Sequence, residues 1–207
     1  MTILQISSIY LHLNPNPKDP NSSWICYNQG LPVAIVSDMK IDYCRRTIVI
    51  ATYGRGIWES KLADIAKIEH TITSTDLLTV AAGTTQIYFY DIVIPAGKTL
   101  TVQGTLKMAS NTRIHVMPGA KVLIDGGLVT SFCSIPWKGF RVFGNKNLSQ
   151  NITSNQGLIE IKNNGTIENA LNAVSLSSLD LNGNVNWNGT GGIIAAKNAI
   201  FRNNKRD

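Results

Sequence analysis

The chain has 207 residues, of which 43% are hydrophobic and 15% charged, a balance typical of globular rather than disordered proteins. The formal net charge of +6 comes from scattered lysines and arginines. Nucleic-acid binding needs a clustered basic face with interleaved aromatic residues, so it is not expected. No run reaches the roughly 18 consecutive apolar residues of a membrane span, and the first residues lack the basic segment and cleavage site of a secretion signal.

The three cysteines lack the CxxC spacing of zinc sites and thioredoxin-like motifs. Cys26 and Cys44 fit either a disulfide between neighbouring strands or two separate buried thiols, of which the second is preferred; Cys133 adds no further motif. The sequence therefore predicts no metal site and no cofactor.

Short strands joined by turns are expected in the first third of the chain. They lie at residues 3–13, 24–27, 35–43 (broken by Asp38), 47–53 and 57–60. Strands at this spacing typically form an antiparallel meander. Gly54 and Gly56 suit a tight turn that needs positive φ, and Trp58 serves as a packing anchor. Arg55 has no second basic residue nearby, so we assign it to the turn rather than to an anionic ligand.

A pattern in this segment, W…GLP…V.D……ATYGRGIWES, resembles the last blade of sialidase-type (BNR-repeat, sortilin-like) β-propellers. Such propellers occur in secreted bacterial glycoside hydrolases and peptidases. The resemblance implies structural roles for Trp58 and the turn at 54–56, although the Asp-box pattern SxDxGxTW of this family is absent. One blade is covered, whereas a propeller typically has four to eight. Residues 1–62 are therefore predicted to be the last blade of a truncated domain.

Residues 63–86 contain no proline, and their isoleucine spacing fits a short helix or irregular structure. We interpret them as a linker and N-terminal cap, because the first coil of a solenoid needs a cover for its open end. His70 has no histidine or carboxylate at ligand spacing, so an exposed side chain is expected there.

A repeated strand–turn unit dominates residues 87–207. Leu100 and Val122, and likewise Val102 and Ile124, occupy equivalent places 22 residues apart. Apolar residues recur at every second position between these copies, as in β-strands. A repeat of this length with glycine and asparagine at its corners is typical of a β-solenoid, in which each coil buries its inward face against its neighbours.

Later coils are less regular. Strands are expected at 137–142, 158–161, 166–168 and 173–176, and a polar insert at 179–190 precedes a further copy at 192–194. Residues 192–194 repeat the pattern of residues 157–159, 35 positions further along the chain. The asparagines at 163, 164, 182, 184, 203 and 204 are placed at corners, because asparagine tolerates the left-handed conformation. In this register Val122 and Ile124 point inward and Leu123 outward.

The stretches IPAGKTLTVQGTLKM, PGAKVLIDGG and GGIIAAKNAIFRNNKRD resemble the right-handed parallel β-helix (pectin-lyase-like) regions of large secreted proteins from gliding bacteria with type IX secretion. The expected fold is therefore all-β, with a partial antiparallel propeller blade and right-handed parallel β-helix coils that are truncated at the C-terminal end. The resemblance implies an extracellular or cell-surface location and a polysaccharide or other surface glycan as partner. Exposed strand edges at both ends favour self-association.

Four residues are candidates for contact with a glycan. Trp187 lies in the polar insert and is the better stacking candidate, whereas Trp137 opens an apolar strand and fits packing between coils better. Lys98 and Lys121 recur at the same turn and would form a basic ladder, although ordinary solvated lysines are the preferred interpretation.

Catalysis by a β-helix would need clustered carboxylates. The candidates are Asp125, Glu160, Glu168 and Asp180, and no two of them occupy corresponding places on adjacent coils. We therefore assign no catalytic residue. We interpret the chain as a non-catalytic structural or glycan-binding part of a secreted or cell-surface multidomain bacterial protein. The alternative is part of a polysaccharide lyase or glycoside hydrolase whose catalytic residues lie outside this chain.

Overall fold

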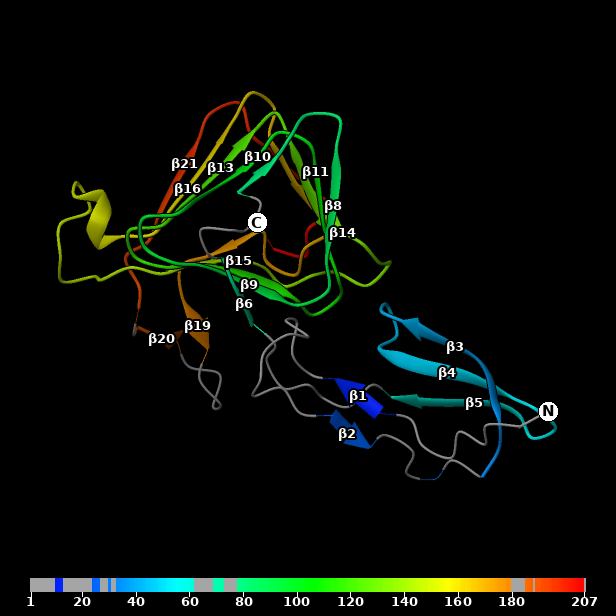
Figure 1. Cartoon of the computed structure of the whole chain (residues 1–207). Helices are drawn as coiled ribbons and strands as arrows, with labels where there is room; N and C mark the ends of the chain where they lie inside the picture. Colours follow the sequence, from blue (N-terminus) through cyan, green and yellow to red (C-terminus); the bar gives the residue numbers. More distant parts are fainter. Residues whose placement is uncertain are drawn as a thin grey trace. The chain divides into compact units, whose positions relative to one another are not determined.

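The computed structural model describes residues 10–12, 24–26, 30, 33–61, 69–72, 78–179, 185–187 and 189–206. The chain divides into two compact units, Met1–Ala66 and Lys67–Asp207. It is all-β, and three five-stranded parallel sheets form most of the second unit (Figure 1). Within the described part of the chain, no helix has the length and hydrophobicity needed to cross a bilayer.

The first unit contains a three-stranded antiparallel meander in the order β3-β4-β5. Its strands are β3 (Val36–Asp42), β4 (Thr47–Thr52) and β5 (Gly56–Lys61). The expected break falls between Val36 and Asp38, where the register shifts as in a β-bulge. The meander is confirmed with strand ends close to those expected. The strand predicted near residue 24, β2 (Trp24–Cys26), instead pairs with β1 (Tyr10–His12) in a separate sheet.

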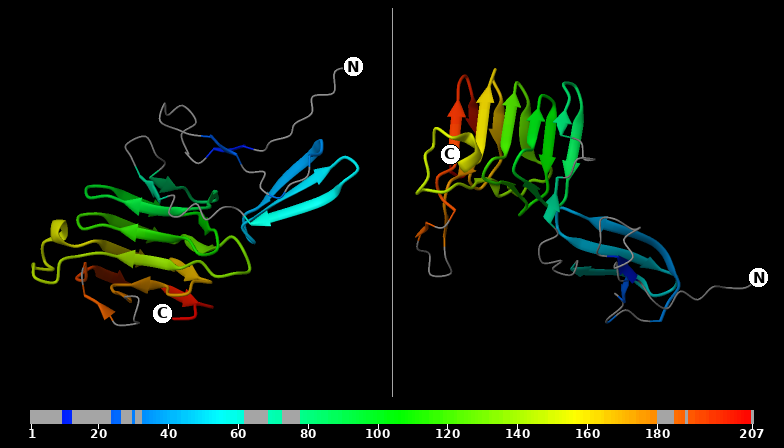
Figure 2. Two further views of the ribbon diagram at one scale, coloured as in Figure 1. Left: turned by 90° about the horizontal axis from the view of Figure 1, so that it is seen from below. Right: turned by 60° about the vertical axis from the view of Figure 1, so that its left-hand side comes forward.

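In the second unit, the chain visits three parallel sheets in turn. Sheet I contains β6 (Glu69–Thr71), β9 (Asp91–Ile94), β12 (Arg113–Val116), β15 (Gly139–Val142) and β18 (Val174–Ser175). Sheet II contains β7 (Thr79–Val80), β10 (Thr99–Val102), β13 (Lys121–Asp125), β16 (Leu158–Lys162) and β21 (Ile193–Ala196). Sheet III contains β8 (Thr85–Tyr88), β11 (Thr105–Met108), β14 (Leu128–Ser131), β17 (Thr166–Glu168) and β22 (Ile200–Arg202). Each passage through the three sheets is one coil, and successive coils stack (Figure 2).

The stack takes in part of the segment interpreted as linker and cap. Strands β6 and β7 lie within residues 63–86, and β8 begins there, and all three pair with strands of the next coil. The boundary between the two units falls after Ala66.

The pairing of β10 with β13 follows the 22-residue period. Leu100 pairs with Val122 and Val102 with Ile124, as expected from the sequence. The inward direction is also confirmed, because Val122 and Ile124 are 0% exposed while Leu123 is half-buried. The later copy is likewise in register, with β16 beside β21 along their length.

The interior is a continuous apolar core in which each inward residue lies beside its counterpart in the next coil. In sheet II, Leu100, Val122 and Ile159 form one such row, and all are almost fully buried. Ile194 continues this row on β21 but is 42% exposed. The core is therefore well covered in the middle of the stack and open to solvent at the last described coil.

Asparagines in the left-handed conformation turn the chain at the corners. They are Asn111, Asn163, Asn164, Asn169, Asn198 and Asn203, with φ between 53° and 63°. Asn163, Asn164 and Asn203 were expected there, whereas Asn182 and Asn184 lie outside the described residues. The backbone N–H of Asn164 donates to the carbonyl oxygen of Asn198 at 2.7 Å, so corners of neighbouring coils are joined directly.

Two of the cysteines, Cys44 and Cys133, are disulfide-bonded. The preferred expectation of separate free thiols is therefore wrong for Cys44. The thiol of Cys26 lies outside the described side chains.

Candidate functional site

Two insertions leave the coil stack at the same corner, between sheets I and II. The first joins β15 to β16 and carries the 3-10 helix Thr153–Asn155. The second joins β18 to β21 and carries β19 (Ser178–Leu179) and β20 (Val185–Asn186), which pair antiparallel. Both are visible in Figure 2 as loops that project from one side of the stack. Loops that project from a rigid scaffold are common places for binding residues.

Direct contacts join the two insertions. The N–H of Gly144 donates to the carbonyl oxygen of Gly189 at 3.0 Å. Gln156 is fully buried and fixes the first insertion: its Oε1 accepts from the N–H of Asn145 at 2.7 Å, and its Nε2 donates to the carbonyl oxygens of Asn145 and Leu148. The buried side chain of Gln156 therefore has its amide groups satisfied within the first insertion.

Trp187 lies in the second insertion and is 61% exposed. Its carbonyl oxygen accepts a hydrogen bond of 2.9 Å from the hydroxyl of Thr190, which closes a short turn. A large aromatic ring in this position offers a flat apolar surface to a ligand.

Trp137 lies in the core of the second unit. It is 0% exposed, its ring packs edge-to-face on Phe140, and its Nε1 donates to the carbonyl oxygen of Glu168 at 3.0 Å. The ring has no face left for a ligand. The structure thus separates the two tryptophans into one packing residue and one surface residue.

The two candidate lysines do not stand at the same register position. Lys121 pairs with Thr99, the residue after Lys98. Lys121 turns instead to Glu160 on the next coil, with 2.6 Å between its Nζ and the carboxylate Oε2. That hydrogen bond is the main cause that lowers the pKa of Glu160. Lys121 and Glu160 neutralise each other's charge, so Lys98 and Lys121 do not form a lysine ladder on the outer face of sheet II.

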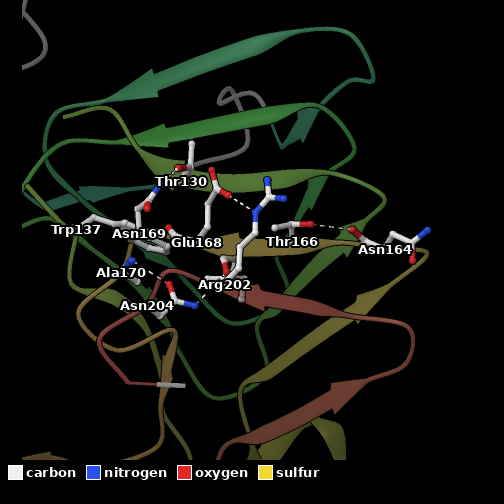
Figure 3. Close-up of polar contacts among 10 residues, drawn as sticks. Thr130, Trp137, Asn164, Thr166, Glu168, Asn169, Ala170, Arg202 and Asn204 are labelled. Atoms are coloured by element: carbon white, nitrogen blue, oxygen red, sulfur yellow. Dashed lines mark hydrogen bonds and ion pairs between the residues drawn. The ribbon is translucent and has the colours of Figure 1, made fainter. Parts of the chain in front are cut away.

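The other described carboxylates also have partners. Asp125 accepts from Nδ2 of Asn163 at 2.7 Å and lies 3.6 Å from Nζ of Lys162. Glu168 accepts a short hydrogen bond from Nε of Arg202 on the next coil (Figure 3). A general acid needs a raised pKa, which a paired cation opposes. Asp180 lies outside the described residues.

Asparagine side chains continue this network at the edge of sheet III. Nδ2 of Asn169 donates to the hydroxyl of Thr130 at 3.1 Å. Asn204 bridges two backbone groups of the preceding coil, since its Oδ1 accepts from the N–H of Ala170 and its Nδ2 donates to the carbonyl oxygen of Ile167 (Figure 3). These bonds hold neighbouring coils together and leave the polar atoms occupied.

A cluster that the sequence did not reveal lies on the outer face of sheet I. Asp91 accepts from the backbone N–H of Arg113 at 2.8 Å and lies 3.3 Å from Nε2 of His115. The ring of Phe143 stacks on His115, with centroids 5.8 Å apart, and lies 4.8 Å from Cζ of Arg141. Arg141 is only 2% exposed although it points away from the core.

In the first unit, the turn expected from the sequence has the predicted geometry. Gly54 and Gly56 have φ of 76° and 80°, and Nε1 of Trp58 donates to the carbonyl oxygen of Arg55 at 2.9 Å. The Arg55 side chain is exposed, and the backbone of this residue supports the tryptophan. These contacts give the turn a structural role.

Among the described residues, no three or more histidine, cysteine, aspartate or glutamate side chains gather in a way that would hold a metal ion. A scan against models of protein families, a search of curated proteins and a search of solved structures each found no match to this chain.

Proposed function

We propose that this chain is a non-catalytic structural and glycan-binding part of a secreted or cell-surface multidomain bacterial protein. In this proposal the second unit is a right-handed parallel β-helix of the pectin-lyase-like kind, and the meander of the first unit is the last blade of a sialidase-type propeller. The strand order of the three sheets and the turn at Gly54–Gly56 support these assignments.

One observation carries the glycan-binding part. Trp187 exposes 61% of its surface on an insertion whose turn is held by Thr190 and whose neighbour Gly189 is hydrogen-bonded to the first insertion. An exposed aromatic ring next to a hydrogen-bonded turn offers a flat surface on which a sugar ring can stack.

The hydrogen bonds and ion pairs that the candidate carboxylates form with other residues support a non-catalytic role. Each described candidate forms a hydrogen bond or an ion pair with a neighbouring residue. These candidates are Asp125, Glu160 and Glu168. Glycoside hydrolysis needs two carboxyl groups placed on either side of the scissile bond, whereas each of these side chains is engaged with a residue of its own surroundings.

A binding measurement tests the proposal. We would titrate the full chain with soluble neutral and acidic polysaccharides by calorimetry and compare W187A with W58F, which alters a half-exposed tryptophan of the first unit. Binding that W187A weakens at least about tenfold and W58F leaves unchanged supports the proposal. Equal binding by W187A, or no binding by the wild type, contradicts it. New reducing ends or unsaturated sugars in the same mixtures would instead support the enzymatic alternative.

A further inference from the structure

Arg141 is a buried cation without a hydrogen-bond acceptor among the described residues. It is 2% exposed, and neither Nη1 nor Nη2 has a hydrogen-bond partner there. A buried guanidinium without a counter-charge is strongly destabilising, because the protein does not replace the hydrogen bonds it made to water. Such a group therefore needs an acceptor from elsewhere.

Arg113 is a second cation in the same place. Arg113 on β12 pairs with Gly139 on β15, and Gly139 precedes Arg141 by two residues. Both arginine side chains therefore point outward from sheet I. Burial and the charge of Arg113 both lower the pKa of Arg141. Nε of Arg113 is also buried and has no hydrogen-bond partner. Two guanidinium groups thus present unpaired donors on one face.

The carboxylate of this cluster does not satisfy Arg141. One oxygen of Asp91 accepts from the backbone N–H of Arg113, and the other lies near His115. Burial and Arg113 lower the pKa of Arg141, whereas the charge of Asp91 acts on Arg113 and partly offsets the lowering of its pKa by burial, so Asp91 compensates Arg113 rather than Arg141. The cluster therefore carries an excess of positive charge in a poorly solvated place.

Aromatic packing holds the guanidinium of Arg141 in a fixed orientation. The ring of Phe143 lies 4.8 Å from its Cζ and stacks on His115. The side chains of His115 and Asp91 are 19% and 26% exposed, so the cluster faces solvent at these two residues. A preorganised guanidinium loses little entropy on binding a planar or tetrahedral oxyanion.

We propose that Arg113 and Arg141 form a binding site for an oxyanion, that is, a carboxylate, sulfate or phosphate group. The guanidinium N–H groups of Arg141 donate to it, and Arg113 adds the second positive charge. The site lies on the outer face of sheet I and includes neither Trp187 nor Thr190. It therefore does not depend on the glycan-binding proposal.

Thermal unfolding of the full chain in acetate, sulfate or phosphate tests the site, with chloride at the same ionic strength as reference. Sulfate and phosphate stabilise most proteins non-specifically, so the comparison is between variants. R141M removes the unpaired cation, and R202M removes an arginine on the outer face of sheet III as the matched control. At tenfold excess over the Kd, we expect the wild type and R202M to gain about 3–6 °C in Tm more than R141M. An equal gain in R141M overturns the proposal.

A second measurement needs no variant and is informative even if R141M does not fold. Titration with acetate, followed through the Nε–Hε NMR signals of Arg113 and Arg141, should move both along a saturating curve. The signal of Arg202 should stay in place. Unchanged signals at Arg113 and Arg141 throughout the titration would show that no oxyanion binds there. Neither readout involves a polysaccharide, so failure of this proposal is distinct from failure of the glycan-binding proposal.

Discussion

The indole nitrogen of Trp137 donates a 3.0 Å hydrogen bond to the carbonyl oxygen of Glu168, which lies 31 residues further along the chain. The bond joins one coil to the next at the point where sheet III turns into sheet I. Trp137 also forms an isolated parallel bridge with Ala170, so backbone and side chain fix the same corner.

We expect W137F to destabilise the second unit by about 1–3 kcal/mol, because the partly buried carbonyl oxygen of Glu168 would lose this donor. W137A should cost about 3–5 kcal/mol, since it also leaves a cavity. The exposed Trp187 provides the matched control, and W187F should stay within about 0.5 kcal/mol of the wild type. Urea denaturation followed by circular dichroism measures all three. A W137A variant as stable as W187F would contradict the assignment of Trp137 to the core.

The direction of the side chains on β13 gives a second prediction. I124D places an uncompensated charge in the core beside Val102 and Ile161, and we expect it to cost more than about 3 kcal/mol. L123D changes the neighbouring outward position and should cost roughly 1 kcal/mol, part of it from repulsion by Glu160. The same denaturation experiment compares the two. A larger loss in L123D than in I124D would mean that the register is wrong by one residue.

The repeat and the side of each strand that faces the core were predictable, because both depend on the local alternation of apolar and polar residues. Residues 22 apart, such as Leu100 and Val122, carry the same apolar pattern, and alternation alone decides which side of a strand is buried. The corner conformations of Asn163 and Asn203 were predictable for the same local reason, since asparagine tolerates positive φ.

Properties that depend on contacts between coils were not predictable from spacing. The recurrence of lysine at Lys98 and Lys121 left a ladder open as the less favoured interpretation, but the spacing did not reveal that Lys121 forms an ion pair with Glu160 on the next coil. The burial of Arg141 depends on its position in the stack beside Phe143, His115 and Arg113. An alternating strand pattern assigns such a residue to the solvent side.

The ion pair between Lys121 and Glu160 predicts a pH dependence. The lowered pKa of Glu160 means that the pair contributes to stability above the ordinary glutamate value of 4.5, and that this contribution is lost as the pH falls through the lowered value. Both side chains are about one-third exposed, so we expect a contribution of only about 0.2–1 kcal/mol. In K121M, NMR titration should show a higher pKa for Glu160. An unchanged pKa would contradict the ion pair.

Position 139 requires glycine for two reasons, the space that its neighbours leave and its backbone conformation. It has φ of 89°, and an added Cβ would lie 1.6 Å from the carbonyl oxygen of Asn172 on the next coil. Gly97 is the matched control, with φ of 77° and no atom within 4 Å of an added Cβ. We expect G97A to cost about 1–2 kcal/mol for backbone strain alone. G139A should lose clearly more stability in thermal denaturation, and similar losses would mean that the corner of Asn172 adjusts easily.

The open face of the last described coil predicts self-association. Ile194 continues the buried row of Ile159 but is 42% exposed, and β21 is the outermost strand of sheet II among the described residues. An unpaired strand edge beside an exposed apolar side chain favours pairing with another chain. We expect sedimentation velocity to show association of the wild type that increases with concentration. I194D should reduce it by placing a charge on the apolar face, while A195D, on the neighbouring exposed position, should reduce it less. A wild type that stays monomeric over the whole concentration range would contradict this prediction, because neither the edge nor Ile194 would then attract a second chain.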